Sequence, residues 1–169
     1  AREGIREQLN HDPSYQVICD RLNNLGRFGQ KTSRGFYIYE GRDRLDDPEV
    51  IELSQSVAKE LNVEQRAIDD NEIVERTIYA MINEGARILE EGVSYRSSDI
   101  DLVFTNGYGF PAFRGGPMQY ADEIGLDVVL AALKKYQHDL GDHGENWFKP
   151  ASLLEKLANE GKTFKSYKG

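Results

Sequence analysis

The sequence predicts a mainly α-helical protein, and three observations favour that class. Apolar residues recur at helical spacing in several segments, most clearly in residues 71–92. Two Asp-Pro pairs, at 12–13 and 47–48, place a capping carboxylate directly before a proline, which is typical of helix starts. Only residues 36–39, FYIY, form a run rich enough in β-favouring side chains to predict a strand.

The first third of the chain is expected to hold two helices around that strand. One helix would begin at the first Asp-Pro pair and run to about Leu25, with Gly26 as the left-handed residue that ends it. Cys19 lies among apolar residues of this helix, so we expect a buried thiol and a reducing, intracellular compartment. The second helix, residues 48–61, would begin at the second pair.

Residues 62–70 are polar and acidic, and they predict a linker between two domains. The domains would be residues 1–61 and residues 71–169. A length of 169 residues suits one medium domain or two small ones.

The second domain opens with the longest predicted helix, residues 71–92, for which Asp69 and Glu72 form an approximate capping box. Its apolar stripe has the width of an ordinary core-facing surface. Gly85 lies on that stripe and predicts the close approach of another helix, while Gly92 would end the helix.

The remaining helix starts are predicted from local capping residues. Ser98-x-x-Asp101 would start a helix at residues 99–106, and Pro117 would open the next, residues 117–125. Asp127 would cap a helix at residues 126–140, and Ser152-x-x-Glu155 would start the last, residues 153–161.

Composition excludes some classes of partner. Charged residues make up 30% of the chain and hydrophobic ones 39%, which is normal for a globular protein. The net charge of −8 argues against a nucleic-acid or anionic-membrane surface, because both need a basic face. No apolar run approaches the ~18 residues of a membrane span. The first residues lack an initiator Met and an apolar core, so we expect no signal peptide and a fragment of a longer chain.

The stretch LGRFGQKTSRGFYIYE, residues 25–40, raises the question of a phosphate-binding loop. A P-loop places glycine directly before the lysine of G-x-x-x-x-G-K-[ST] and follows a strand, whereas here Gln30 precedes the lysine and a helix precedes the stretch. Its glycines are therefore interpreted as turn residues. Its cations remain candidates for phosphate contacts, with a solvated turn as the favoured alternative: Arg27, Lys31 and Arg34.

No catalytic or metal-binding constellation is predicted. The segment HDLGDHGENW crowds histidines with carboxylates, but His138 and His143 straddle Gly141 and are five residues apart, so no helix face would hold both. We interpret the segment as a solvated loop at a helix end, and the lone His11 as exposed or as a local cap. The sequence has neither a nucleophile motif nor a G-x-G-x-x-G dinucleotide fingerprint.

The stretch NGYGFPAFRGGPM, residues 106–118, is the most informative one. Its glycines permit an irregular path, and its aromatic residues make that path apolar. Such a loop between two capped helices is either a packed connector, which composition alone favours, or the wall of an apolar pocket.

Residues 71–127 closely resemble the C-terminal helical domain of 3-hydroxyacyl-CoA dehydrogenases. The resemblance rests on NEGARILEEG, SSDID, GYGFPAFRGGP and ADEIGLD, which follow one another in the family's order and spacing. The stretch GRFGQKTSRGFYIYE resembles the segment that closes a preceding copy of the same domain. The chain would then hold the tail of one helical domain and a complete second one. That arrangement resembles the end of multifunctional fatty-acid oxidation α-chains, which are fused to an enoyl-CoA hydratase/isomerase and carry two copies.

The resemblance implies an NAD-dependent oxidation of an (S)-3-hydroxyacyl-CoA by the intact enzyme. NAD and the family's catalytic His–Glu pair belong to a preceding Rossmann domain, so this segment would hold no cofactor, metal or catalytic residue and would be inactive alone. It would supply a wall of the acyl-CoA pocket together with inter-domain or dimer packing. The implied substrate contacts are Asn106, Tyr108, Phe110 and Arg114.

Two positions depart from the family pattern. Glu75 stands where the active copy carries a substrate-contacting asparagine, and a carboxylate cannot donate the amide hydrogen bond. We therefore expect the second copy to be structural and to complete the pocket. Asn106 stands where bacterial α-chains carry a tyrosine, so a contact there would have a changed chemistry.

The resemblance also implies partners and a location. Acyl-CoA would be the ligand, and self-association or a thiolase subunit would be the protein partner; no nucleic acid and no membrane span are expected. The location would be cytoplasmic in a bacterium and peroxisomal in a eukaryote. The rival interpretations are a non-catalytic helical scaffold or interaction module, and a binding domain from a related two-domain dehydrogenase.

Overall fold

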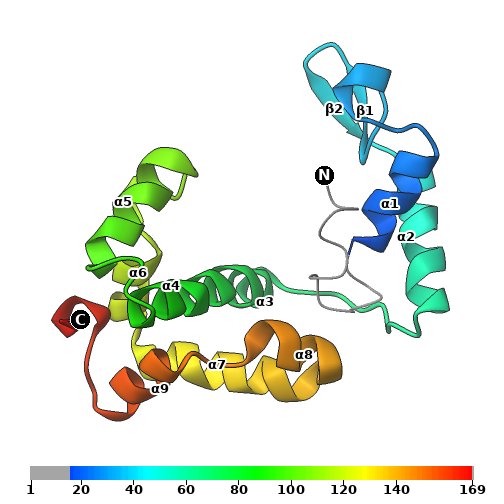
Figure 1. The fold of residues 1–169 in the computed structure, drawn as a ribbon. Coiled ribbons are helices and arrows are strands. Elements are labelled where there is room, and N and C mark those ends of the chain that lie inside the picture. The colour runs from blue at the N-terminus through cyan, green and yellow to red at the C-terminus, as the bar shows by residue number, and fades with distance from the viewer. Residues whose placement is uncertain (1–15, 169) are drawn as a thin grey trace. The chain divides into compact units, whose positions relative to one another are not determined.

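The computed structural model describes residues 16–168, and the chain divides into two compact units. The first unit ends at Ala67 and the second begins at Ile68, so the boundary falls within the predicted linker (Figure 1).

The first unit begins with helix α1, Val17–Asn24. The helix start predicted at residues 12–13 lies outside the described residues, but the predicted end is confirmed. Gly26 has a φ of 72°, and the N–H of Arg27 donates to the Leu22 carbonyl at 2.9 Å. This is the Schellman arrangement, in which a left-handed glycine lets the chain turn back on the last helical turn. Cys19 is half-buried, and so it is less enclosed than expected.

A β-hairpin follows, of which the sequence predicts only the first strand. Strand β1, Tyr37–Glu40, pairs antiparallel with β2, Asp43–Asp46, so that Tyr37 lies opposite Asp46. Gly41 opens the two-residue loop with a φ of 63°, the sign that a type II′ turn requires at that position. The second strand, DRLD, is polar and exposed on both faces, so it lacks the alternation that would predict it.

Helix α2, Pro48–Glu60, closes the first unit and confirms the cap at Asp47. The Asp47 carboxylate accepts a hydrogen bond from the Glu49 N–H at 3.0 Å, and Pro48 occupies the first helical position. A short 3₁₀ turn, η2 at Gln30–Thr32, lies between α1 and the hairpin.

The second unit opens with one long helical segment that is not uniform. It consists of α3, Asp70–Val74, a π-helical turn η3, Glu75–Tyr79, and α4, Ala80–Glu90. The sequence predicts this helix as uninterrupted, because no proline interrupts residues 71–92. Asp69 caps the segment by accepting from the Glu72 N–H at 2.8 Å, as predicted.

Five further α-helices and two short 3₁₀ turns complete the described part of the second unit. They are α5, Ser97–Gly107; η4, Ala112–Arg114; α6, Pro117–Ile124; α7, Leu126–Asp139; α8, Gly141–Phe148; α9, Ser152–Asn159; and η5, Phe164–Ser166. Their apolar faces meet those of α4 in one core. Its most enclosed apolar side chains are Ile82, Ala86, Met118, Ala121, Val129, Leu133, Leu154 and Phe164.

Gly85 marks the close helix crossing that its place on the apolar stripe predicts. Helices α4 and α6 contact each other. A Cβ atom added to Gly85 would lie 2.5 Å from the Met118 sulfur, which is closer than real Cβ atoms come. The glycine is thus needed for the approach of α6, and its predicted role is confirmed.

Three predicted caps are wrong. Helices α5, α7 and α9 begin after Arg96, Gly125 and Ala151, so Ser98, Asp127 and Ser152 lie within the helices. The start of α9 instead has a partner from α4, because the Ala151 N–H donates to the Asn83 side chain at 2.7 Å. A side chain from another helix thus accepts a hydrogen bond at the start of α9, where a residue close in sequence was expected to do so.

The segment HDLGDHGENW is also not a solvated loop. Most of it forms α8, which lies beside α7 in Figure 1. The buried Phe148 ring packs against Tyr136, with ring centres 5.5 Å apart. Gly144 lies against the carbonyl oxygens of α7, where a Cβ atom would be only 2.4 Å from Tyr136 O. This close packing favours a helix where charge alone favours a loop.

Candidate functional site

The connection between α5 and α6 carries the predicted substrate contacts. Both Tyr108 N–H and Phe110 N–H donate to the Phe104 carbonyl, at 3.2 and 3.0 Å, so the chain turns tightly as it leaves α5. The rings of Phe104 and Tyr108 lie 5.3 Å apart. The 3₁₀ turn η4 follows, and it ends at Gly115 with a φ of 76°. We call residues 108–116 the aromatic loop.

The aromatic loop exposes large apolar side chains. Tyr108 is 76% exposed and Phe113 is 84% exposed, whereas Phe110 is half-buried. A packed connector would bury such side chains, since each aromatic ring gains free energy on leaving water. The exposure therefore favours a binding surface over the connector that composition favours.

Arg114 lies between two aromatic rings. Its guanidinium carbon is 5.5 Å from the ring centre of Phe113 and 5.5 Å from that of Tyr120, which is cation–π distance. No carboxylate among residues 16–168 lies within ion-pair distance of it. Rings that orient a guanidinium leave its N–H groups able to meet an anion from solvent.

Asn106 is exposed on the last turn of α5. Its amide nitrogen donates to the Leu102 carbonyl at 2.9 Å, within the same helix. The side-chain oxygen is an acceptor, so it suits a ligand N–H, such as those of an amide. The structure thus places Asn106 beside the aromatic loop but directs one of its amide hydrogens into the helix.

A buried carboxylate that the sequence assigns elsewhere holds the far end of the aromatic loop. Asp101 was expected to pair with Ser98 at the start of α5, but it is only 8% exposed and faces α6. Its oxygens accept from Met118 N–H at 2.7 Å and from Gln119 N–H at 3.2 Å. The sequence feature that could have indicated this contact is Gly116, because a glycine before Pro117 leaves α6 without a capping side chain of its own.

Burial raises the pKa of the Asp101 carboxyl, and the charge of Asp122 adds to that effect. Hydrogen bonds from the two N–H groups of α6 act in the opposite direction. Burial likewise raises the pKa of Asp122, which accepts from Phe164 N–H at 2.7 Å and Lys165 N–H at 3.0 Å. Asp122 therefore does for η5 what Asp101 does for α6.

Glu75, the position where an asparagine was expected, faces the interior of the second unit. The hydroxyl of the buried Tyr136 donates to the Glu75 carboxylate at 2.5 Å. Burial raises the pKa of Tyr136, and the hydrogen bond to Glu75 raises it further. The carboxylate thus ties the π turn η3 to α7, which agrees with the structural role expected for this copy.

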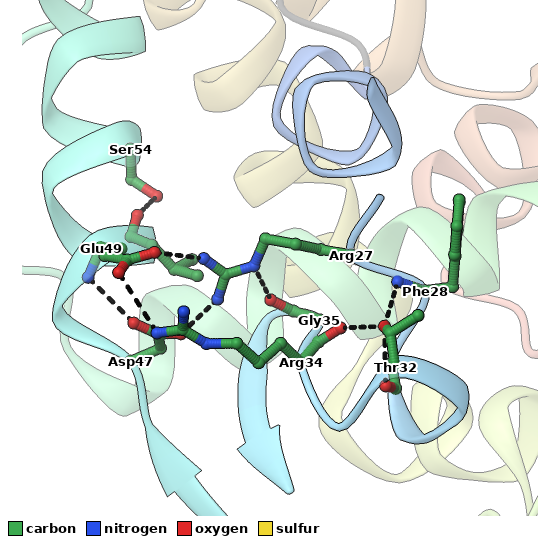
Figure 2. Close-up of polar contacts among 10 residues, drawn as sticks. Arg27, Phe28, Thr32, Arg34, Gly35, Asp47, Glu49 and Ser54 are labelled. Atoms are coloured by element: carbon green, nitrogen blue, oxygen red, sulfur yellow. Dashed lines mark hydrogen bonds and ion pairs between the residues drawn. The ribbon is translucent and has the colours of Figure 1, made fainter. Parts of the chain in front are cut away.

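In the first unit, the predicted phosphate contacts lie near carboxylates of their own chain. Arg27 is only 9% exposed, and Figure 2 shows its guanidinium facing Asp47, Glu49 and the Gly35 carbonyl. The distance to Glu49 is 2.9 Å, and Arg34 joins both carboxylates at 3.3 Å. Arg27 therefore stabilises the unit from within.

The glycines of this stretch are turn residues. The Gly29 N–H donates to the Arg34 carbonyl at 2.9 Å, and a Cβ atom on Gly35 would lie 2.8 Å from the Gly29 backbone. The Thr32 hydroxyl accepts from Phe28 N–H at 2.9 Å and closes the turn further (Figure 2). Lys31 is exposed on the turn, so its phosphate contact stays a prediction, as do those of the two arginines.

The charges of the first unit predict that it loses stability in acid before the second unit does. Burial alone would raise the pKa of Asp47, but the hydrogen bonds from Arg27 and Glu49 N–H, with the charges of Arg27 and Arg34, lower it overall. A lowered pKa in the folded state stabilises above the unfolded value of about 4 and ceases to do so as pH falls through the lowered value. Asp101 and Asp122 have raised pKa values, so folding favours their protonated forms and acid removes no stability through them. The pKa values of Glu145 and Glu160 are lowered, but both side chains are exposed, so their ion pairs contribute little to the stability of the second unit.

Urea titrations between pH 6 and pH 3, followed by NMR signals assigned to each unit, test this expectation. The midpoint of the first unit should fall with pH more steeply than that of the second. Asp47→Asn should remove part of the pH dependence of the first unit, and Glu60, whose pKa the hydrogen bond from Arg21 also lowers, accounts for a further part. An equal decline in both units would contradict the assignment.

The comparisons with known proteins decide the family. Residues 73–168 match the family model of the 3-hydroxyacyl-CoA dehydrogenase C-terminal domain. The chain belongs to the 3-hydroxyacyl-CoA dehydrogenase family. The match runs from the end of α3 to η5 and includes the aromatic loop, whereas Arg27 and Arg34 of the first unit lie outside it.

The relatives of this chain are longer proteins. It is 42% identical over 150 residues to the human peroxisomal bifunctional enzyme, covering 87% of this chain and 20% of that protein. It is 34% identical over 165 residues to the fatty acid oxidation complex subunit alpha of Psychrobacter arcticus, covering 96% of this chain and 22% of that one. The chain thus spans about a fifth of the length of these relatives.

A solved structure confirms the mainly α-helical class of this family member. The dehydrogenase part of multifunctional enzyme 1 from C. elegans aligns with a TM-score of 0.63 and 29% identity, covering 92% of this chain and 35% of that one. The predicted C-terminal helical domain of the dehydrogenase family is therefore confirmed.

Two further properties of the described residues bear on other functions. No helix within residues 16–168 combines the length and the apolar character that crossing a membrane requires. In the same part of the chain, no group of three or more His, Cys, Asp or Glu side chains is arranged to hold a metal ion.

Proposed function

We propose that this chain is part of an NAD-dependent (S)-3-hydroxyacyl-CoA dehydrogenase of fatty-acid β-oxidation, and that its aromatic loop forms one wall of the acyl-CoA pocket. The family match supports the reaction class. The observation that carries the pocket assignment is the exposure of Tyr108 and Phe113 beside the guanidinium of Arg114, within the matched range. Apolar rings next to a cation suit a ligand that joins an acyl-pantetheine chain to phosphate groups.

Each side chain would have a separate task in the pocket. The Tyr108 and Phe110 rings would contact the apolar parts of the ligand, and Arg114 would contact a phosphate. The Asn106 side-chain oxygen would accept from an amide N–H of the pantetheine arm. The phosphate contacts expected of Arg27, Lys31 and Arg34 in the first unit stay a separate prediction.

The remaining chemistry would belong to other parts of a longer protein. This sequence has no dinucleotide fingerprint, so NAD would be bound by a Rossmann domain that also supplies the histidine base and its glutamate partner. An enoyl-CoA hydratase part, self-association or a thiolase subunit would complete the assembly. The location would be the peroxisome in a eukaryote or the cytoplasm in a bacterium.

A second candidate function is a scaffold without substrate contact. The outer face of α5 favours it, because Leu102 and Val103 are exposed there in addition to the aromatic loop. The two functions differ in kinetics, since a scaffold role predicts that loop substitutions leave the Michaelis constants unchanged.

The isolated chain should show no dehydrogenase activity. It is expected neither to bind NADH nor to reduce acetoacetyl-CoA, because the groups that would bind the cofactor and transfer the proton lie elsewhere. Absorbance at the NADH band, measured with the pure chain and a full-length enzyme as positive control, checks this. Saturable NADH oxidation by the pure chain would contradict the proposal that the cofactor site and the catalytic base lie in other parts of the protein.

Replacing Arg114 by glutamine in the full-length protein should raise the KM for the hydroxyacyl-CoA. An exposed ion pair contributes at most about 1 kcal/mol, so we expect up to about a fivefold rise, with the KM for NAD unchanged. Arg96→Gln is the matched control, since Arg96 is an equally charged, exposed residue at the start of α5 that pairs with Asp99. An unchanged KM in Arg114→Gln would favour the scaffold.

A further inference from the structure

The first turn of α6 is capped from another helix. Gly116 precedes the helix and has no side chain, so it cannot accept from the free N–H groups of that turn. Asp101, which lies 17 residues before Met118, accepts from the Met118 and Gln119 N–H groups instead. Because this carboxylate is nearly enclosed, water is a poor substitute for it.

The same carboxylate determines where the aromatic loop ends. Gly116 has a φ of 119°, and a Cβ atom added to it would overlap the Asp101 carboxylate. The backbone of the loop therefore lies directly against Asp101 as it enters α6. At its other end, the loop is held by the Phe104 carbonyl.

Both anchors belong to α5, three residues apart, so this single helix fixes the two ends of the loop. The side chains between the anchors include Phe113 and Arg114. Their positions depend on the backbone path that the anchors impose, since neither side chain is buried.

We propose that Asp101 is a positioning residue for acyl-CoA binding, which acts by holding the aromatic loop in its binding-competent path. The proposal rests on the proposed function of that loop. Asp101 does not itself contact the ligand; it acts through the start of α6 and through Gly116.

The molecule contains a matched control for this proposal. Asp122 accepts from two N–H groups at the start of η5, much as Asp101 accepts from two at the start of α6. Both carboxylates are largely shielded from solvent, and folding favours the protonated form of both. Asp101 lies against Gly116 of the aromatic loop, whereas the hydrogen bonds of Asp122 go to η5. A purely structural role therefore predicts similar effects of both substitutions.

The test compares Asp101→Leu, Asp101→Asn and Asp122→Asn in the full-length protein. Amide hydrogen exchange of residues 108–116 and the kinetic constants for hydroxyacyl-CoA and NAD are measured for each variant. If Asp101→Leu leaves the loop competent for about a tenth of the time, the KM for the acyl-CoA rises about tenfold, in proportion to the lost population. Loop exchange should rise with it, while kcat at saturation and the KM for NAD stay unchanged.

The two asparagine variants separate positioning from stability. Asp101→Asn keeps one acceptor oxygen for Met118 N–H, so its KM should lie between those of wild type and Asp101→Leu, and it serves as the test if the leucine variant does not fold. Asp122→Asn should lower the melting temperature without changing loop exchange or KM.

Each contrary result has a distinct meaning. Unchanged KM values in the Asp101 variants, with a raised KM in Arg114→Gln, would overturn the positioning role and leave the proposed function intact. Unchanged KM values in all of these variants would overturn the proposed function and the positioning role with it. An equal rise in Asp122→Asn would overturn the positioning role, because it would show a general loss of stability.

Discussion

Replacing Gly85 by leucine lowers the free energy of unfolding of the second unit by about 1–3 kcal/mol, the usual cost of overpacking a tight core. A leucine at this helical position would gain up to ~1 kcal/mol of intrinsic helix propensity. A net loss of stability would therefore come from the tight packing between α4 and α6. The side chain would enter the space of Met118, which is fully buried and has no solvent to move into.

Urea denaturation followed by Trp147 fluorescence measures the loss at Gly85. Gly107→Leu is the matched control, because Gly107 is also helical but has no atom within 4 Å of an added Cβ in the described structure. That variant should be neutral or slightly more stable. A rise in the stability of Gly85→Leu would mean that α6 does not cross α4 there.

Replacing Asn83 by leucine removes a buried hydrogen-bonding centre at nearly constant volume. Asn83 is fully buried; its amide nitrogen donates to the Lys149 carbonyl at 2.8 Å, and its oxygen accepts from Ala151 N–H at 2.7 Å. The Lys149 carbonyl keeps a bond from Arg87 at 2.7 Å, but the buried Ala151 N–H is left without its partner. Leaving such a group unpaired costs about 1–3 kcal/mol.

The same substitution on α5 provides the comparison for Asn83. Asn106→Leu also removes an amide that donates to a backbone carbonyl, but Asn106 is exposed, so water replaces the bond and stability should change by less than about 0.5 kcal/mol. Melting curves of both variants check the difference. Equal losses would show that burial does not set the cost at Asn83.

The candidate site illustrates how far sequence reasoning extends. The resemblance placed Tyr108, Phe110 and Arg114 on one glycine-rich loop. The structure shows that this loop exposes Tyr108 and Phe113, and that the Arg114 guanidinium lies near the rings of Phe113 and of Tyr120 in α6. Whether these groups bind acyl-CoA stays a prediction. The carboxylate that anchors the loop, Asp101, was assigned to the wrong helix start.

The sequence by itself determined the features whose physical cause is local. The cap of Asp47 before Pro48, the left-handed Gly26 and the cap of Asp69 each depend on hydrogen bonds that span only a few residues. The apolar stripe also predicted the close crossing at Gly85, because a small residue on a buried face has few other uses.

Only the tertiary structure decided which side chains accept from the first N–H groups of α6 and α9. At η5 it adds Asp122 to a local capping box of Thr163 and Ser166. The acceptors Asp101, Asn83 and Asp122 lie 17, 68 and 42 residues before the N–H groups they bind at Met118, Ala151 and Phe164. A free N–H group takes any acceptor that packing brings to it, and a serine nearby in sequence has no advantage once a buried side chain already occupies that position. Packing likewise made α8 a helix and paired the polar strand β2, because contacts with α7 and β1 outweigh weak local preferences.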